Sequence, residues 1–260
     1  MIRLLKIELN KTLYSRQIWI ILGLYIVLLV PVAFAIDSIN FGGNSGEIPN
    51  PAIGTFTIFN HPTVWHNMAY LFTWFQLFLG IIVISLVANE FSQKTLRQNI
   101  IDGLTKWEVI ASKEIVIVLL SFFSTILLVL LTLILGNSSV DVSIWEGFNA
   151  VPAYFICILL YLNFAYFISF WVKKSGLAIG LLLIYSLIIE NLLTWKLPDN
   201  IGTLFPMQLG SNMIPNPMGG MLNLEATINL SPLNIGMTLV YIGLFLGLIF
   251  WMLKKGHAAK

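Results

Sequence analysis

The chain has 260 residues, of which 58% are hydrophobic and only 10% are charged. Its mean hydropathy is +0.88, and soluble domains carry about 25% charged residues, so the composition excludes an ordinary soluble protein and indicates a membrane protein. The net charge of +2 is too small and too dispersed to indicate a nucleic-acid-binding protein.

The first segment, residues 1–17, has leucines on one helical face and basic residues on the other. This pattern predicts an amphipathic helix in the membrane interface, although a merely solvated start of the first span fits it equally well. The apolar run 18–36 is longer than the ~7–15 residues of a signal-peptide core, so we expect a retained first span. Residues 37–67, rich in Gly, Asn and Pro, are expected to form an outer loop.

Five further apolar runs follow, each about long enough to cross a bilayer as a helix. The expected spans are 68–88, 115–136, 150–172, 176–194 and 234–253. Lys173 and Lys174 mark a tight turn between the fourth and fifth spans. The loop 195–233 has apolar patches too short to span, and we expect short helices against the outer surface there. The sequence thus predicts an all-α membrane protein, a single domain with six transmembrane helices.

The distribution of basic residues predicts how these spans are oriented. With both termini inside, thirteen of the fourteen Lys and Arg residues fall on the cytoplasmic side, and Lys196 is the exception. This bias follows the positive-inside rule, and an even number of spans agrees with it. We therefore expect a multi-pass protein of the cell membrane, embedded in the lipid bilayer, with both termini cytoplasmic.

The stretch 89–114, between the second and third spans, is the longest polar interval that we expect between spans on the cytoplasmic side. Gly103 is typical of a residue that ends a helix, because glycine adopts the left-handed conformation at low cost. Thr105 and Glu108 have the spacing of a capping box, which starts a helix. The sequence therefore predicts a short, charged helix beneath the membrane, suited to be moved by a partner protein.

The motifs of an ATPase and of a membrane hydrolase are missing from the sequence. There is no Gly-x-x-x-x-Gly-Lys-Ser/Thr loop to hold nucleotide phosphates, and the spans contain neither His-Glu-x-x-His nor Gly-x-Ser-x-Gly. We therefore expect no catalytic residues and no enzymatic activity in this chain.

A few polar residues lie inside the predicted spans, namely Gln76, Asn163, Glu190 and Asn191. Such groups are costly in hydrocarbon unless they face protein or a wet cavity. For Gln76 and Asn163 we favour hydrogen bonds between helices. All four are candidates for a substrate pathway or subunit interface, and Glu190 fits such a role as well as it fits contact with the outer membrane interface or a bond to a neighbouring helix.

Thioether and imidazole side chains gather in the expected outer loops, and ligands of this kind suit Cu(I). Methionine also fills irregular apolar gaps, and the spacing of these residues is loose, so we expect no metal site. The residues concerned are Met207, Met213, Met218, Met221, His61 and His66.

The stretch between the second and third spans resembles the corresponding segment of ABC-2 type permeases, the transmembrane subunits of ABC transporters. The residues that carry this likeness are Glu90, Thr95, Arg97, Thr105, Lys106 and Lys113. Lys94, Leu104 and Lys106 stand where the family usually has Gly, Pro and Arg. The layout of the whole chain is also similar, with an interfacial N-terminal helix, six spans and large first and last outer loops.

The resemblance implies a permease subunit of an ATP-driven exporter, in which two permease chains pair with two cytoplasmic ATPase subunits. The second permease is another copy of this chain or a homologous permease, and ATP and Mg are bound by the ATPases, so that this chain holds no cofactor. The resemblance also implies that a coupling helix, Gly103–Lys113, transmits the movement of the ATPases. The residues assigned to this coupling are Gly103, Thr105, Lys106, Trp107, Glu108 and Lys113.

Within that segment, the resemblance implies that Lys106 and Glu108 are exposed to the ATPase and that Trp107 enters a groove in it. Two other readings stay open. The stretch is a solvated loop held by lipid phosphates, or the chain is a force-transmitting membrane subunit that serves extracytoplasmic assembly without a translocated substrate.

Overall fold

The computed structural model describes residues 11–12, 14–38, 63–101, 103–136, 143–197, 202–216, 228 and 230–255. Over these residues the regular structure is helical, and no strand occurs among them. The elements are α2 (Arg16–Ser38), α3 (Thr63–Ser92), α4 (Thr95–Ile101), α5 (Lys106–Leu135), α6 (Ala150–Val172), α7 (Ser175–Ile184), the π-helix η1 (Tyr185–Ile189), α8 (Glu190–Lys196), α10 (Pro206–Met213) and α11 (Pro232–Lys254).

In the described part of the chain, six helical segments are long and apolar enough to cross a membrane. They are α2, α3, α5, α6, the continuous unit α7–η1–α8, and α11. Each lies on one of the six expected spans, so the prediction of an all-helical, multi-pass membrane protein is confirmed. Most of the helix expected over residues 1–17, and most of the loop 37–67, lie outside the described residues.

Two helices extend well beyond the apolar runs that predicted them. α3 and α5 each have 30 residues, whereas the expected spans were 68–88 and 115–136. The segment Gly103–Lys113 was expected as a separate short helix, but from Lys106 onward it forms the first two turns of α5. The physical reason is that no Gly or Pro interrupts 106–115, so backbone hydrogen bonding continues across the change from charged to apolar residues. The separate short helix of this region is α4.

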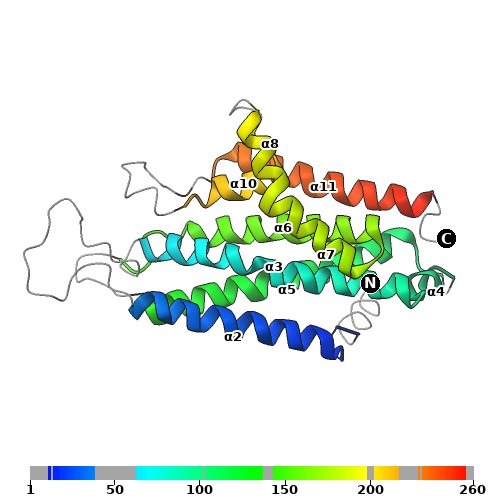
Figure 1. Ribbon diagram of the computed structural model, residues 1–260, viewed down its shortest axis with the longest axis horizontal. Helices are drawn as coiled ribbons and strands as arrows, with labels where there is room; N and C mark the ends of the chain where they lie inside the picture. The colour runs from blue at the N-terminus through cyan, green and yellow to red at the C-terminus, as the bar shows by residue number, and fades with distance from the viewer. Residues whose placement is uncertain are drawn as a thin grey trace, which may run out of the picture.

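The central helix of the molecule is α6, which packs against α3, α5, α7, α10 and α11 (Figure 1). It begins and ends where the sequence predicted, at Ala150 and Val172. The turn that follows is also confirmed, because only two residues, Lys173 and Lys174, lie between α6 and α7. α10 lies against α6 and α11, so the last long loop contains a short helix as expected, whereas its placement against the outer surface stays a prediction.

The helices around α6 leave apolar side chains uncovered. Examples are Trp19 on α2, 55% exposed, and Leu239 on α11, 62% exposed. The fifth span runs obliquely to the other long helices and carries α8 away from α3 and α5 (Figure 1). In water such a surface would drive association, whereas in a bilayer lipid tails cover it, so the exposure agrees with the membrane assignment.

The start of α2, α4, the α6–α7 turn and the end of α11 all lie at one end of the bundle (Figure 1), which we call the basic end. The described basic residues of these segments and of the adjacent start of α5 are Lys11, Arg16, Lys94, Arg97, Lys106, Lys113, Lys173, Lys174, Lys254 and Lys255. Lys196 instead closes α8, away from this end.

A chain of three hydroxyl groups joins three spans inside the bundle. The Ser124 hydroxyl on α5 lies 2.8 Å from that of Tyr25 on α2 and 2.6 Å from that of Tyr154 on α6. All three side chains are buried. Because apolar contacts in lipid do not favour one helix partner strongly over another, such polar bonds help to select the neighbours.

Replacing Ser124 with Ala removes a hydroxyl that contacts both tyrosines, which also hydrogen-bond each other. We expect the free energy of unfolding to fall by about 1–3 kcal/mol, because buried hydroxyls of two other helices lose their shared partner. The measurement is unfolding of the purified protein in mixed detergent micelles, followed by circular dichroism.

The matched control is Ser121→Ala. The Ser121 hydroxyl is also buried, but it donates to the Ile117 carbonyl of its own helix. A loss for Ser121→Ala equal to that for Ser124→Ala would show that the link between helices contributes nothing of its own.

Candidate functional site

The connection between α3 and α5 is shaped by two residues in the left-handed backbone region. Lys94, after α3, has φ +57°, and Gly103, after α4, has φ +96°. Glycine adopts this region without steric cost, which explains why the resemblance expects glycine at the position of Lys94. A Cβ on Gly103 would meet no atom within 4 Å, so glycine is favoured there by conformation and not by space.

The end of α4 and the start of α5 follow the sequence prediction. The Leu104 N–H donates to the Asn99 carbonyl at 3.1 Å, the bond of a Schellman helix end with glycine before the donor. Thr105 Oγ1 accepts from the Glu108 N–H at 3.3 Å, and the Glu108 carboxylate accepts from the Thr105 N–H at 2.9 Å. The helix end at Gly103 and the capping box are therefore both confirmed.

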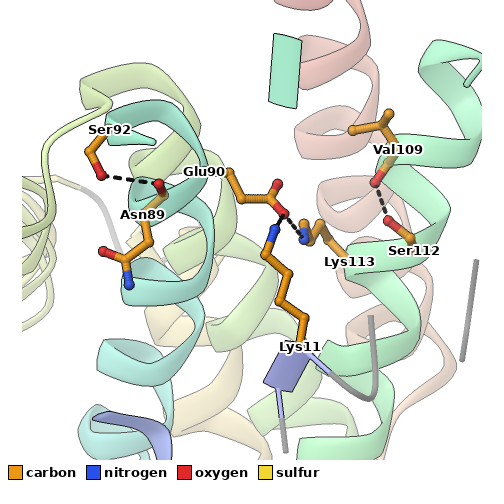
Figure 2. Close-up of polar contacts among 7 residues, drawn as sticks. All are labelled: Lys11, Asn89, Glu90, Ser92, Val109, Ser112 and Lys113. Atoms are coloured by element: carbon orange, nitrogen blue, oxygen red, sulfur yellow. Dashed lines mark hydrogen bonds and ion pairs between the residues drawn. The ribbon is translucent and has the colours of Figure 1, made fainter. Parts of the chain in front are cut away.

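A buried carboxylate ties this connection to the segment that precedes α2. Lys11 Nζ and Lys113 Nζ donate to the same oxygen of Glu90, Oε1, at 2.5 and 2.6 Å, and Figure 2 shows the two ammonium groups meeting there. Glu90 is 1% exposed and Lys113 is 4% exposed. The other carboxylate oxygen, Oε2, has no hydrogen-bond partner in the described part of the protein. We call these three residues the Glu90 cluster.

The Glu90 cluster joins three segments that are distant in sequence. Lys11 precedes α2, Glu90 lies in the last turn of α3, and Lys113 lies in the second turn of α5. Buried charges are costly unless they are paired, so displacement of one segment relative to the others is opposed by the separation of these charges. The three segments are therefore expected to move together at the basic end.

The side chains exposed near the start of α5 differ in part from those that the resemblance implied. The Glu108 carboxylate is already engaged by Thr105. Trp107 stacks on Phe250 of α11, with ring centroids 4.5 Å apart, and is still 58% exposed. Ile101, at the end of α4, is 74% exposed. Sequence reasoning missed Ile101, although an apolar residue directly before a predicted helix end is a signal that was available.

The other residues of the family-like motif are placed less completely. Thr95 begins α4, and its buried hydroxyl oxygen has no partner among the described residues. Arg97 lies in the same helix, but its side chain is outside the described part. Sequence reasoning also missed Lys11 as a partner of Glu90, because nothing in a linear pattern links residues 79 positions apart.

Asn163, in the centre of α6, forms the bond between helices that the sequence favoured. Its Nδ2 donates to Glu114 Oε1 of α5 at 3.0 Å and to the carbonyl of Leu159 at 3.1 Å. Glu114 directly follows Lys113, so polar contacts to α3 and α6 start from adjacent residues of α5.

Glu190 and Asn191 hold α10 against the fifth span. The N-terminal residue of α10 that would usually supply a cap is Phe205, which has no side-chain acceptor. Glu190 Oε1 instead accepts from the Gln208 N–H at 2.7 Å, and Gln208 Nε2 donates to Asn191 Oδ1 at 3.2 Å. The structure thus shows a bond to a neighbouring helix, one of the two roles that the sequence left open for Glu190.

The described thioether and imidazole residues do not converge. Met213 is buried in the core, and Met207 lines a cavity together with Gln76 and Cys157. His66 Nε2 lies 2.7 Å from the Pro215 carbonyl oxygen. In the described chain no group of three His, Cys, Asp or Glu residues is placed to hold a metal ion. The remaining three, His61, Met218 and Met221, are outside the described residues.

Replacing Glu90 with Gln removes the carboxylate to which the buried ammonium of Lys113 donates. We expect the free energy of unfolding to fall by about 3–5 kcal/mol, measured by the same detergent unfolding experiment. Lys11→Gln should cost only about 0–1 kcal/mol, because the Lys11 side chain is 36% exposed.

The double variant Glu90→Gln/Lys113→Gln distinguishes two effects of the single variant. These are the loss of the Glu90 carboxylate and the burial of the Lys113 charge without that carboxylate. The double variant removes both buried ions, so it should be more stable than Glu90→Gln alone. If the double variant is instead the less stable of the two, burial of the Lys113 ammonium without the Glu90 carboxylate is not the source of the loss.

Residues 55–257 match the sequence model of a family described as protein of unknown function (DUF2705). The matched range contains α3 to α11, and therefore Glu90, Lys113 and the whole connection between them, whereas Lys11 lies before it. No protein of curated description matches the chain. Because the match spans most of its length, the chain belongs to the DUF2705 family of proteins of unknown function.

Proposed function

We propose that this chain is the permease subunit of an ATP-driven ABC transporter of the ABC-2 type, an exporter powered by separate cytoplasmic ATPase subunits. The observation that carries the proposal is the Glu90 cluster, which joins the connection between the second and third spans to the segment before the first span. The lack of a phosphate-binding loop in the sequence agrees with ATP hydrolysis by a partner.

In this proposal the basic end faces the cytoplasm of a cell membrane. The support is the positive-inside rule, since Lys and Arg residues gather at that end and Lys196 lies away from it. α4 and the first turns of α5 are then the parts of the connection that meet the ATPase. The coupling element is accordingly the short helix α4 together with residues 103–113, and not a separate helix over Gly103–Lys113.

The exposed side chains at this position suit a protein interface. Ile101 and Trp107 supply apolar surface, and Lys106 adds a positive charge beside them. Interface centres are enriched in aromatic and apolar groups with charges toward the rim. Glu108 contributes indirectly in this arrangement, because its capping bonds with Thr105 fix where α5 begins.

In this proposal the Glu90 cluster transmits a displacement of α4 to the membrane-spanning helices. ATP binding closes the two ATPases and displaces α4 with the start of α5. Because Glu90 holds Lys113 in a buried pair, α3 and α5 are displaced as one unit, and the contact with Lys11 links the segment before α2 to them more weakly. Two permease chains, either identical or homologous, line the pathway between them in this proposal.

Replacing Ile101 with Arg, together with Lys106→Glu, tests the docking surface without touching the Glu90 cluster. Ile101 is 74% exposed, so the variant should remain folded in the membrane. We expect the wild-type chain, purified in mild detergent, to retain a protein with a phosphate-binding loop whose ATP turnover it stimulates. The variant should lower the affinity for this ATPase about tenfold or more, which corresponds to about 1.4 kcal/mol.

The matched control is Lys196→Glu, the same charge reversal away from the basic end, and it should bind the ATPase as the wild type does. Trp107 is left intact in this experiment, because its removal also breaks the stack on Phe250. Unchanged ATPase affinity and turnover in the double variant, or the absence of any such ATPase from the wild-type preparation, would overturn the proposal.

A further inference from the structure

A cavity of about 210 Å³ lies between α3, α6, η1 and α10, and the α3 residues that line it precede Glu90 on the same helix. Its lining includes Trp74 and Gln76 from α3, Cys157 from α6, Ser186 from η1 and Gly210 from α10. A cavity of 150 Å³ in a protein core is already large enough to bind benzene. The volume here is therefore sufficient for a molecule of one or two rings.

One residue that lines the cavity, Gln76, has a side-chain oxygen without a partner among the described residues. Gln76 Oε1 is buried and accepts no hydrogen bond from any described residue. The hydroxyls of Thr73 and Ser186, which also line the cavity, donate to the carbonyls of Tyr70 at 2.7 Å and Leu183 at 3.4 Å. A buried acceptor without a donor costs about 1–3 kcal/mol, so the lining favours an occupant that brings an N–H or O–H group.

The cavity wall is held in shape by specific features of the fold. η1 is a π-helix within the fifth span, and single π turns are frequent at functional sites. α10 is fixed by its bond to Glu190 and approaches α6 so closely that a Cβ on Gly210 would lie 2.7 Å from Cys157 Sγ. These restraints keep α10 and the fifth span in place around the space between them.

The rim of the cavity is apolar where it meets the surroundings. Trp74 is 65% exposed and Leu187, from η1, is 58% exposed. Both belong to membrane-spanning segments, so lipid is the medium outside this part of the wall. The remaining lining is mixed, with Leu77, Met207 and Ile214 providing apolar surface. A ligand that partitions into the bilayer could therefore enter the cavity from the lipid and would match its largely apolar lining.

We propose that this cavity binds a small, largely apolar molecule of one or two rings, whose N–H or O–H group donates a hydrogen bond to Gln76 Oε1. The inference goes beyond the proposed function, because it requires no ATPase and concerns a site far along the chain from α4. Its failure would leave the docking proposal untouched, and the reverse also holds.

The test measures binding of tritiated indole to the protein in phosphatidylcholine nanodiscs, with empty nanodiscs as the background. Unlabelled 1-methylindole, which is of similar shape but has no N–H donor, serves as competitor. We expect saturable binding of indole and an affinity for 1-methylindole that is about tenfold weaker, because only indole satisfies Gln76.

Two variants locate the binding site. Gln76→Leu removes the acceptor at similar size and should bind the two compounds equally well. Ser186→Phe places a ring in the cavity and should abolish saturable binding of both. Gln98→Leu, the same replacement on the exposed surface of α4, should behave as the wild type.

The folded state of each variant is checked by its elution profile and thermal transition, so that loss of binding is not confused with loss of structure. The proposal is overturned if the wild-type protein shows no saturable indole binding above empty nanodiscs. It is equally overturned if folded Gln76→Leu keeps the tenfold discrimination, since the ligand would then lie elsewhere.

Discussion

The sharing of one buried carboxylate oxygen by two lysines is the interaction on which the basic end of this protein depends. α3 and α5 both continue past their apolar runs, and in those extensions buried apolar residues such as Val109 and Ile110 alternate with charged ones. Glu90 adds a polar restraint to this packing, because Lys113 and Lys11 both donate to the same oxygen atom. At low dielectric, separation of the buried charges of Glu90 and Lys113 is strongly opposed, so α3 and α5 are held together, and the partly exposed Lys11 adds a weaker link to the segment before α2.

Elsewhere in the bundle, polar bonds between helices serve the same purpose with neutral groups. Tyr25, Ser124 and Tyr154 join three spans, and Asn163 joins α6 to α5. Lipid tails and apolar side chains are chemically alike, so burial alone gives little preference for one helix partner over another. A few hydrogen bonds at defined heights along the helices therefore specify the arrangement around α6.

The two proposed activities occupy different parts of the molecule. Docking of an ATPase uses α4 and the start of α5, whereas the ligand cavity is bounded by the fifth span and α10. α6 contacts α5, α7 and α10. A displacement of α5 at the basic end can therefore be transmitted through α6 to the helices that form the cavity wall. Glu190 stabilises that wall, because its carboxylate accepts the hydrogen bond that joins the fifth span to the first turn of α10.

The sequence by itself determined the features that depend on local chemistry. Apolar length predicted six spans, Gly103 predicted a helix end, and Thr105 with Glu108 predicted a capping box, since each depends on residues a few positions apart. Tertiary structure alone decided the pairing of Glu90 with Lys11, the capping of α10 by Glu190 and the cavity beside Gln76. These features join residues that are 18 or more positions apart, and no local periodicity records which distant groups meet when the helices pack.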